Sequence, residues 1–128
     1  MTVEFQHVNE RVMLHKYTEP IREDDFVATL AQFHAFAETT MRTVFLIADF
    51  TEVYRFPPYM LSLGLRTGQT NPVRNPKLEH IVVIAHMPLI MSLTSMLVKI
   101  TGITKFSIVR TRAQAEEEIQ ALNYSSVP

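Results

Sequence analysis

Cysteine is absent from the 128 residues of the chain, and its absence excludes disulfides, thiolate metal sites and cysteine nucleophiles. Glycine occurs only 3 times, at Gly64, Gly68 and Gly102. These positions cannot spell either of the glycine-rich motifs that hold phosphate groups, so a nucleotide-binding loop of that kind is also excluded. Neither sign of charge is in excess, since 12 Lys and Arg face 13 Asp and Glu. We therefore expect neither nucleic acid nor an anionic membrane as a partner.

The residues that are present have the composition of an ordinary globular domain, with 47% hydrophobic and 20% charged side chains. The length fits one domain, which we place at residues 1–122, followed by a frayed tail at 123–128. The first residues have neither a basic head nor an apolar stretch, so we expect no secretory signal. A run without Lys, Arg, Asp or Glu extends from Ile81 to Val98, but His86 and Pro88 interrupt it. Because a membrane span needs ~20 apolar residues, we predict a cytoplasmic protein with no membrane insertion.

Hydrophobic periodicity and turn residues divide the chain into strands and helices. Strands are expected at about 3–7, 12–14, 44–48, 81–85 and 106–109. Helices are expected from Asp24, as the N-cap, to Thr40; from Pro57-Pro58 to Thr67; from Pro88 to Thr101; and from a Thr111/Gln114 capping box to Leu122. The order β-β-α-β-α-β-α-β-α predicts an α/β fold with a single mixed β-sheet and with the helices mainly on one face.

The first two strands are expected to form a hairpin with Asn9-Glu10 as its turn. That turn pairs Phe5 with Leu14 and Glu4 with His15, and it gives the hairpin one apolar face.

The five histidines do not show the spacing of a metal site. In the predicted hairpin, His7 and His15 point to opposite faces, and His34 is alone on its helix. His80 and His86 share one face of a strand but are about 20 Å apart along it. No serine stands in a G-x-S-x-G motif. We therefore predict no metal, no cofactor, no catalytic residue and no enzymatic activity.

Asp49 directly follows the apolar run Val44–Ala48 and precedes Thr51 and Glu52. Binding sites in parallel sheets tend to form just beyond the carboxyl ends of the strands, which makes Asp49 a candidate binding residue. The alternative is structural, because an Asp side chain often accepts a hydrogen bond from the backbone two residues later in a turn.

The helix expected at Leu89–Thr101 has more apolar surface than one core face requires. Ile90, Met91 and Val98 lie partly outside its main stripe. Either this helix has a wide core face, or these three residues form the interface of a homodimer.

Two segments resemble one protein family. Val44–Val53, VFLIADFTEV, resembles the strand and turn of STAS domains, the sulfate-transporter and anti-sigma-factor-antagonist domains of the SpoIIAA-like fold. Phe106–Ala115, FSIVRTRAQA, resembles the last strand of that family and its capped helix, and the order of elements agrees over nearly the whole chain. The resemblance implies a SpoIIAA-like fold and a regulatory, non-enzymatic role.

The chain departs from this family at one position. Anti-sigma-factor antagonists carry an Asp-Ser pair at the start of the helix after this strand, and that serine is phosphorylated. The matching stretch here is Phe56-Pro57-Pro58-Tyr59, in which Pro58 takes the place of the phosphoacceptor. We therefore expect no serine phosphorylation switch.

These observations together predict a STAS-like module that binds a protein partner and forms a homodimer. Its predicted binding surface lies at the end of the strand that starts at Val44 and is rich in Tyr and Arg, the residue types that anchor interfaces. We call it the strand-end surface: Asp49, Thr51, Tyr54, Arg55, Tyr59 and Arg66. The alternative is a carrier or sensor of a small apolar or lipid-like ligand. It rests on the Met and Phe content and on a fold shared with lipid-transfer domains of the CRAL-TRIO type.

Overall fold

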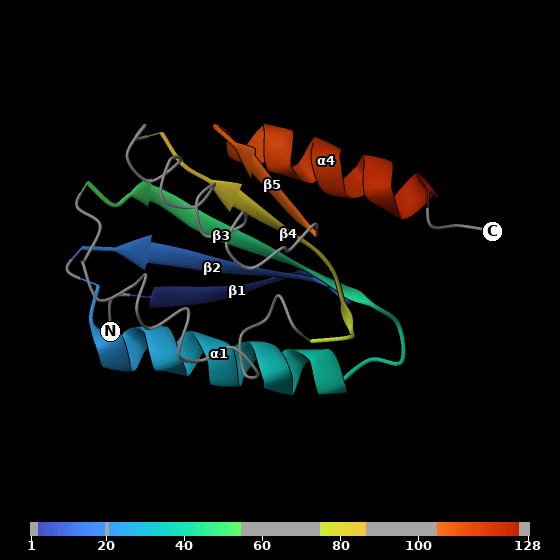
Figure 1. Ribbon diagram of the computed structural model, residues 1–128, viewed down its shortest axis with the longest axis horizontal. Helices are drawn as coiled ribbons and strands as arrows, with labels where there is room; N and C mark the ends of the chain where they lie inside the picture. The colour runs from blue at the N-terminus through green and yellow to red at the C-terminus, as the bar shows by residue number, and fades with distance from the viewer. Residues whose placement is uncertain (1–2, 20, 55–74, 87–104, 126–128) are drawn as a thin grey trace.

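The computed structural model describes residues 3–19, 21–54, 75–86 and 105–125. Over these residues the chain has an α/β fold with a single mixed sheet of five strands, in the order β1-β2-β3-β4-β5 (Figure 1). The strands are β1 Val3–Asn9, β2 Val12–Thr18, β3 Val44–Glu52, β4 Leu78–Ile84 and β5 Phe106–Val109. β1 and β2 are antiparallel, and the other neighbours are parallel. The predicted mixed sheet of an α/β fold is therefore confirmed.

The centre of the sheet is apolar on both faces because helices cover both sides of it. In β3 every side chain from Val44 to Phe50 is buried, and in β4 the same holds from Ile81 to Ile84. Continuous apolar runs of this kind are typical of parallel strands that are covered twice. This explains why the sequence shows no alternation of apolar and polar residues there.

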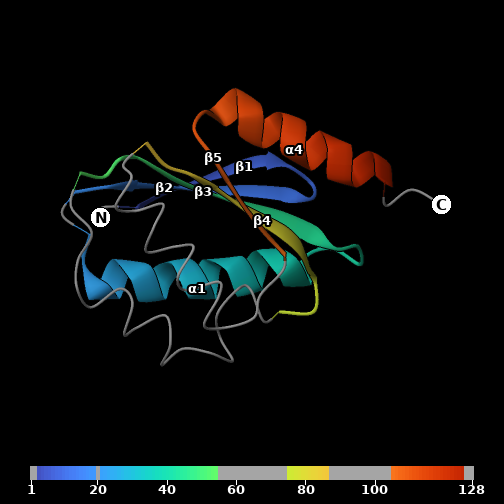
Figure 2. The same cartoon turned by 45° about the horizontal axis from the view of Figure 1, so that its top comes forward.

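The two described helices, α1 Glu23–Glu38 and α4 Arg112–Ser125, cover opposite faces of the sheet (Figure 2). On one face Phe33 and Phe36 of α1 pack with Met13 and Leu46. On the other face Ala115 and Ile119 of α4 belong to a cluster with six sheet residues: Val12, Leu14, Phe45, Ile47, Val82 and Ile84. None of the described helices is long and apolar enough to cross a membrane.

We predict four helices, mainly on one face of the sheet; the two that the structure describes lie on opposite faces (Figure 2). α1 belongs to the crossover from β2 to β3, whose right-handed path selects its face. α4 follows the last strand and is part of no crossover, so it can cover the opposite face. The helices expected at 57–67 and 88–101 lie outside the described residues.

The register of the opening hairpin differs by one residue from the predicted one. Phe5 lies opposite His15 and not opposite Leu14. The turn residues are Glu10 and Arg11, which pairs Asn9 with Val12, and an irregularity between His7 and Asn9 moves the register back by one residue. The side chain of Asn9 stabilises this turn, since its Oδ1 accepts a hydrogen bond from the Arg11 N–H at 2.9 Å.

The corrected register also places His7 and His15 on the same face of the hairpin, toward α1. The His7 ring packs against Phe36, and His15 contacts Gln32. The prediction that these two histidines point to opposite faces is therefore wrong.

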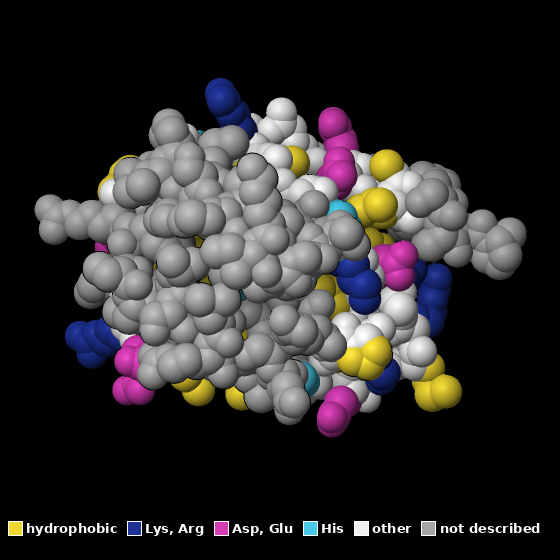
Figure 3. Space-filling view, viewed as in Figure 1, with side chains coloured by type: hydrophobic (Ala, Val, Ile, Leu, Met, Phe, Trp, Pro, Cys, Tyr) yellow, Lys and Arg dark blue, Asp and Glu magenta, His cyan; other side chains and the backbone are white. Residues whose placement is uncertain are grey.

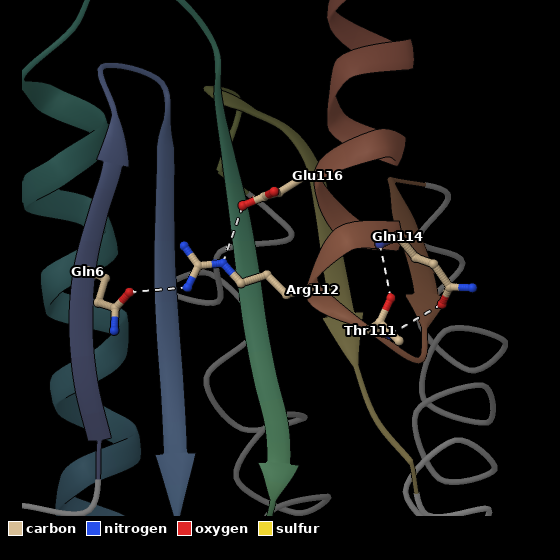
Figure 4. Close-up of polar contacts among 5 residues, drawn as sticks. All are labelled: Gln6, Thr111, Arg112, Gln114 and Glu116. Atoms are coloured by element: carbon tan, nitrogen blue, oxygen red, sulfur yellow. Dashed lines mark hydrogen bonds and ion pairs between the residues drawn. The ribbon is translucent and has the colours of Figure 1, made fainter.

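The ends of the helices agree only in part with the prediction. Asp24 is not the N-cap of α1, because the cap is Arg22 and Asp24 lies in the first turn, where its charge suits the helix dipole. The predicted capping box of α4 is present (Figure 4). The Gln114 N–H donates to Thr111 Oγ1 at 3.1 Å, and Gln114 Oε1 accepts from the Thr111 N–H at 3.2 Å.

Candidate functional site

Asp49 lies inside β3, three residues before its end, and not after the strand as predicted. Only 8% of this residue is exposed, and its Oδ1 accepts a hydrogen bond from the Thr51 N–H at 2.9 Å. The register between β2 and β3 shifts at this point, because Lys16 faces Asp49 whereas Thr18 faces Glu52. The Asp49 carboxylate thus holds a bulge in β3. The structural interpretation of this residue is the one that its contacts support.

The end of β3 carries polar and charged side chains. Glu52 forms an ion pair with Lys16 of β2 at 3.6 Å, and both side chains are partly exposed. α1 begins at the same end of the sheet, and Figure 3 shows acidic and basic side chains next to each other over its start. Charges of both signs therefore lie at the end of the sheet where β3 ends (Figure 3).

Tyr54 follows β3 and is a large, exposed side chain at this end of the sheet, with 66% of the residue exposed. Its backbone N–H donates to Glu19 Oε1 at 2.8 Å. The preceding residue, Val53, is buried and donates its own N–H to the Phe50 carbonyl at 3.0 Å. Since both the backbone and the neighbouring side chain are held, the exposed ring stands on a fixed support.

An aromatic pair forms part of that support. The rings of Tyr17 and Phe50 are stacked with centroids 4.5 Å apart and an interplanar angle of 6°. Both residues are buried, and burial raises the pKa of Tyr17 to about 12. The stack joins Tyr17, near the end of β2, to Phe50 in the bulge of β3.

The structure thus brings together Asp49, Thr51 and Tyr54 of the predicted strand-end surface. Of these, Tyr54 is exposed and Thr51 is partly exposed. Asp49 is buried and holds the backbone of Thr51. The other predicted surface residues, Arg55, Tyr59 and Arg66, lie outside the described residues, as do the predicted dimer residues Ile90, Met91 and Val98.

A second polar cluster, which the sequence analysis missed, connects the sheet to α4. His80 Nε2 lies 2.6 Å from Ser107 Oγ, and Ser107 donates a hydrogen bond to Glu118 Oε1 at 3.0 Å. Because the single hydroxyl hydrogen goes to Glu118, His80 donates to Ser107. Burial lowers the pKa of His80, while Glu118 and Glu79 act in the opposite direction.

His80 and Ser107 can be linked only once β4 and β5 are paired, because side chains alternate between the two faces of a sheet. Val82 lies opposite Ser107, so His80 and Ser107 share the α4 face of neighbouring strands. His86, which the sequence pattern places on the same strand face as His80, lies beyond β4 and is exposed. Among the described residues, no three His, Asp or Glu side chains gather as a metal site would require.

An open groove of about 470 Å³ lies next to this cluster, between β5 and α4. Its lining residues are Ile108, Val109, Arg110, Gln114, Glu117 and Glu118. We call it the β5–α4 groove. It combines two apolar strand residues with side chains of both charges.

Comparisons with family models, with curated proteins and with solved structures give no match for the chain.

Proposed function

We propose that the chain is a cytoplasmic, non-catalytic STAS-like regulatory module that binds a partner protein through the strand-end surface. The observation that carries the proposal is the exposure of Tyr54 on a backbone held by Glu19 and by the bulge of β3. A rigid aromatic side chain loses little conformational entropy when a partner covers it. Tyrosine is also enriched among the residues that dominate binding energy.

The surroundings of Tyr54 support the same interpretation. Interfaces between proteins combine an apolar or aromatic centre with a polar rim. Here the rim consists of Glu19, Glu52 and Lys16, and the last two already form an ion pair with each other. In this arrangement the ring supplies affinity, while the rim selects the orientation of the partner.

The finer assignment to the SpoIIAA-like fold rests on the order of elements and on the resemblance of two segments. A hairpin, the crossover through α1, and a capped helix after the last strand are all found in the described residues. The proposal includes the absence of a serine switch, since Pro58 offers no hydroxyl at the matching position. It also includes a homodimer formed through Ile90, Met91 and Val98.

The test compares two exposed side chains at opposite ends of the sheet. Partners are first isolated by pull-down with the wild-type chain, and their affinity is measured by calorimetry. We expect Tyr54→Ala to weaken binding by tenfold or more, because the loss of a central anchor costs about 2 kcal/mol. Met41→Ala is the matched control, since Met41 is 99% exposed in the connection between α1 and β3.

Equal affinities for the two variants would contradict the proposal. Native mass spectrometry of the freshly purified chain tests the alternative, the carrier or sensor. A retained lipid that is lost only on denaturation would favour the carrier and reject the interaction module.

A further inference from the structure

Among the described residues, no strand pairs with the outer edge of β5. The Ile81 N–H donates to the Lys105 carbonyl and the Ala85 N–H donates to the Val109 carbonyl, both at 3.0 Å. Because backbone groups alternate along a strand, residues 105, 107 and 109 face β4, whereas Phe106 and Ile108 direct their N–H and C=O groups away from it. β5 is the last strand of the described sheet. Its outer edge can therefore accept a further strand.

The β5–α4 groove lies along this edge, with Ile108 and Val109 on the strand side and Gln114, Glu117 and Glu118 on the helix side. The helix side is held in place before any ligand binds. Ser107 bonds to Glu118, and Gln114 accepts hydrogen bonds from the backbone of Arg110 and Thr111. A groove between an edge strand and a fixed helix is the geometry in which several domains bind extended peptides by adding a strand.

The charges of the groove indicate which peptide it fits. Its lining includes two carboxylates, those of Glu117 and Glu118, and one guanidinium, that of Arg110. Ser107 already bonds to Glu118, whereas Glu117 is exposed. A basic side chain on the added strand would meet Glu117.

We propose that the β5–α4 groove is a second docking site, which binds an extended segment of a partner protein carrying Lys or Arg. The segment adds to the outer edge of β5, and its basic side chain pairs with Glu117. The added strand is short, because only Phe106 and Ile108 provide outward backbone groups on β5.

A second copy of the chain is the competing occupant, and charge disfavours it. A two-fold pairing of β5 with β5 would continue the sheet and bring the two α4 helices onto the same face. Glu117 and Glu118 of both copies would then meet in one interface, where like charges oppose association.

The test selects phage-displayed random heptapeptides on the full-length chain. The best peptide is synthesised with a fluorescent label, its affinity is measured by anisotropy, and its site is mapped by NMR. We expect the selected peptides to alternate apolar residues with Lys or Arg, and we expect shifts at residues 106–110 and 114–118. Ile108→Pro removes an outward N–H and should abolish binding.

A charge reversal on the exposed part of α4 tests the groove without altering the strand. Glu117→Lys should weaken peptide binding about fivefold or more. Glu116→Lys is the matched control, because Glu116 is outside the groove and pairs with Arg112 at 3.3 Å. Circular dichroism of each variant establishes that it is folded.

Three results would overturn the proposal: no enriched peptide, shifts away from the groove, or equal effects of the two reversals. A dimer that Ile108→Pro converts to a monomer would assign the edge to a second copy instead. The strand-end surface is separate from this groove. A failure of this experiment therefore leaves the result for Tyr54 unaffected.

Discussion

The imidazole Nε2 of His15 lies 2.5 Å from Oε1 of Gln32, so a buried side chain of β2 donates a hydrogen bond to α1. The ring of Phe5 packs edge-on against the imidazole, with centroids 5.1 Å apart. Burial lowers the pKa of His15 to about 4, and the hydrogen bond to Gln32 offsets only part of this effect. The folded protein thus holds this histidine neutral under conditions in which an unfolded chain would protonate it.

The first prediction is a loss of stability in mild acid. The pKa of His15 is about 4 in the folded state, and the ordinary pKa of a histidine is 6.5, so the unfolded state binds more protons between these values. The contribution of His15 to the free energy of unfolding is fully present above pH 6.5. It is lost as pH falls toward 4, by up to about 3 kcal/mol. Urea unfolding at pH 7 and pH 4.5 measures the loss.

His15→Gln supplies an amide donor in place of Nε2 and cannot titrate, so its stability should fall much less over the same pH range. His86→Gln, at an exposed position beyond β4, is the matched control and should keep the wild-type slope. If His15→Gln has the same pH dependence as the wild type, another group is responsible.

The second prediction concerns the bulge of β3. Asp49→Ala removes the acceptor of the Thr51 N–H and should lower the free energy of unfolding by about 1–2 kcal/mol. Asp49→Asn keeps an oxygen in the same place and should lose less. Urea unfolding at neutral pH compares the two variants. Equal losses would show that the charge of Asp49, and not its hydrogen bond, stabilises the bulge.

Those parts of the fold that depend on neighbours in sequence could be predicted. The apolar runs of β3 and β4 identify buried strands, and Thr111 and Gln114 are only three residues apart, so their capping box is visible in the sequence. Asp49 shows the limit of this reasoning. Its hydrogen bond to Thr51 is local and was one of two alternatives, but its place inside β3 depends on how β2 pairs with it.

Features that depend on distant residues could not be predicted. The hairpin turn is tied to a later part of the chain, because the Arg11 side chain donates to the Thr43 carbonyl at 2.6 Å after α1. The contact between His80 and Ser107 joins residues 27 positions apart. Nothing near either residue marks the other, because the contact exists only once β4 and β5 are paired.

The third prediction tests the polar link between the sheet and α4. Ser107→Ala removes the donor to Glu118 and the acceptor of His80, and should lower the free energy of unfolding by about 1 kcal/mol. Amide hydrogen exchange should also become faster in α4. In a double-mutant cycle, Glu118→Gln should cost less in the Ser107→Ala background than in the wild type. Additive losses would contradict the link.

The fourth prediction is the homodimer. The proposed interface residues Ile90, Met91 and Val98 lie outside the described residues, so the prediction rests on the excess apolar surface of the segment Leu89–Thr101. Soluble monomers rarely leave such a patch in water, and a two-fold dimer would cover it with its own copy. Light scattering at micromolar concentration should give about twice the chain mass of 14.7 kDa.

Met91→Glu should convert this dimer to a folded monomer, because the contact would bury an unpaired carboxylate. Met41→Glu carries the same change at a position that is 99% exposed, and it should remain a dimer. Circular dichroism establishes that both variants are folded. A wild-type mass near 14.7 kDa would reject the dimer. A dimer that survives Met91→Glu would place the interface on another surface, for which the edge of β5 is the first to test with Ile108→Pro.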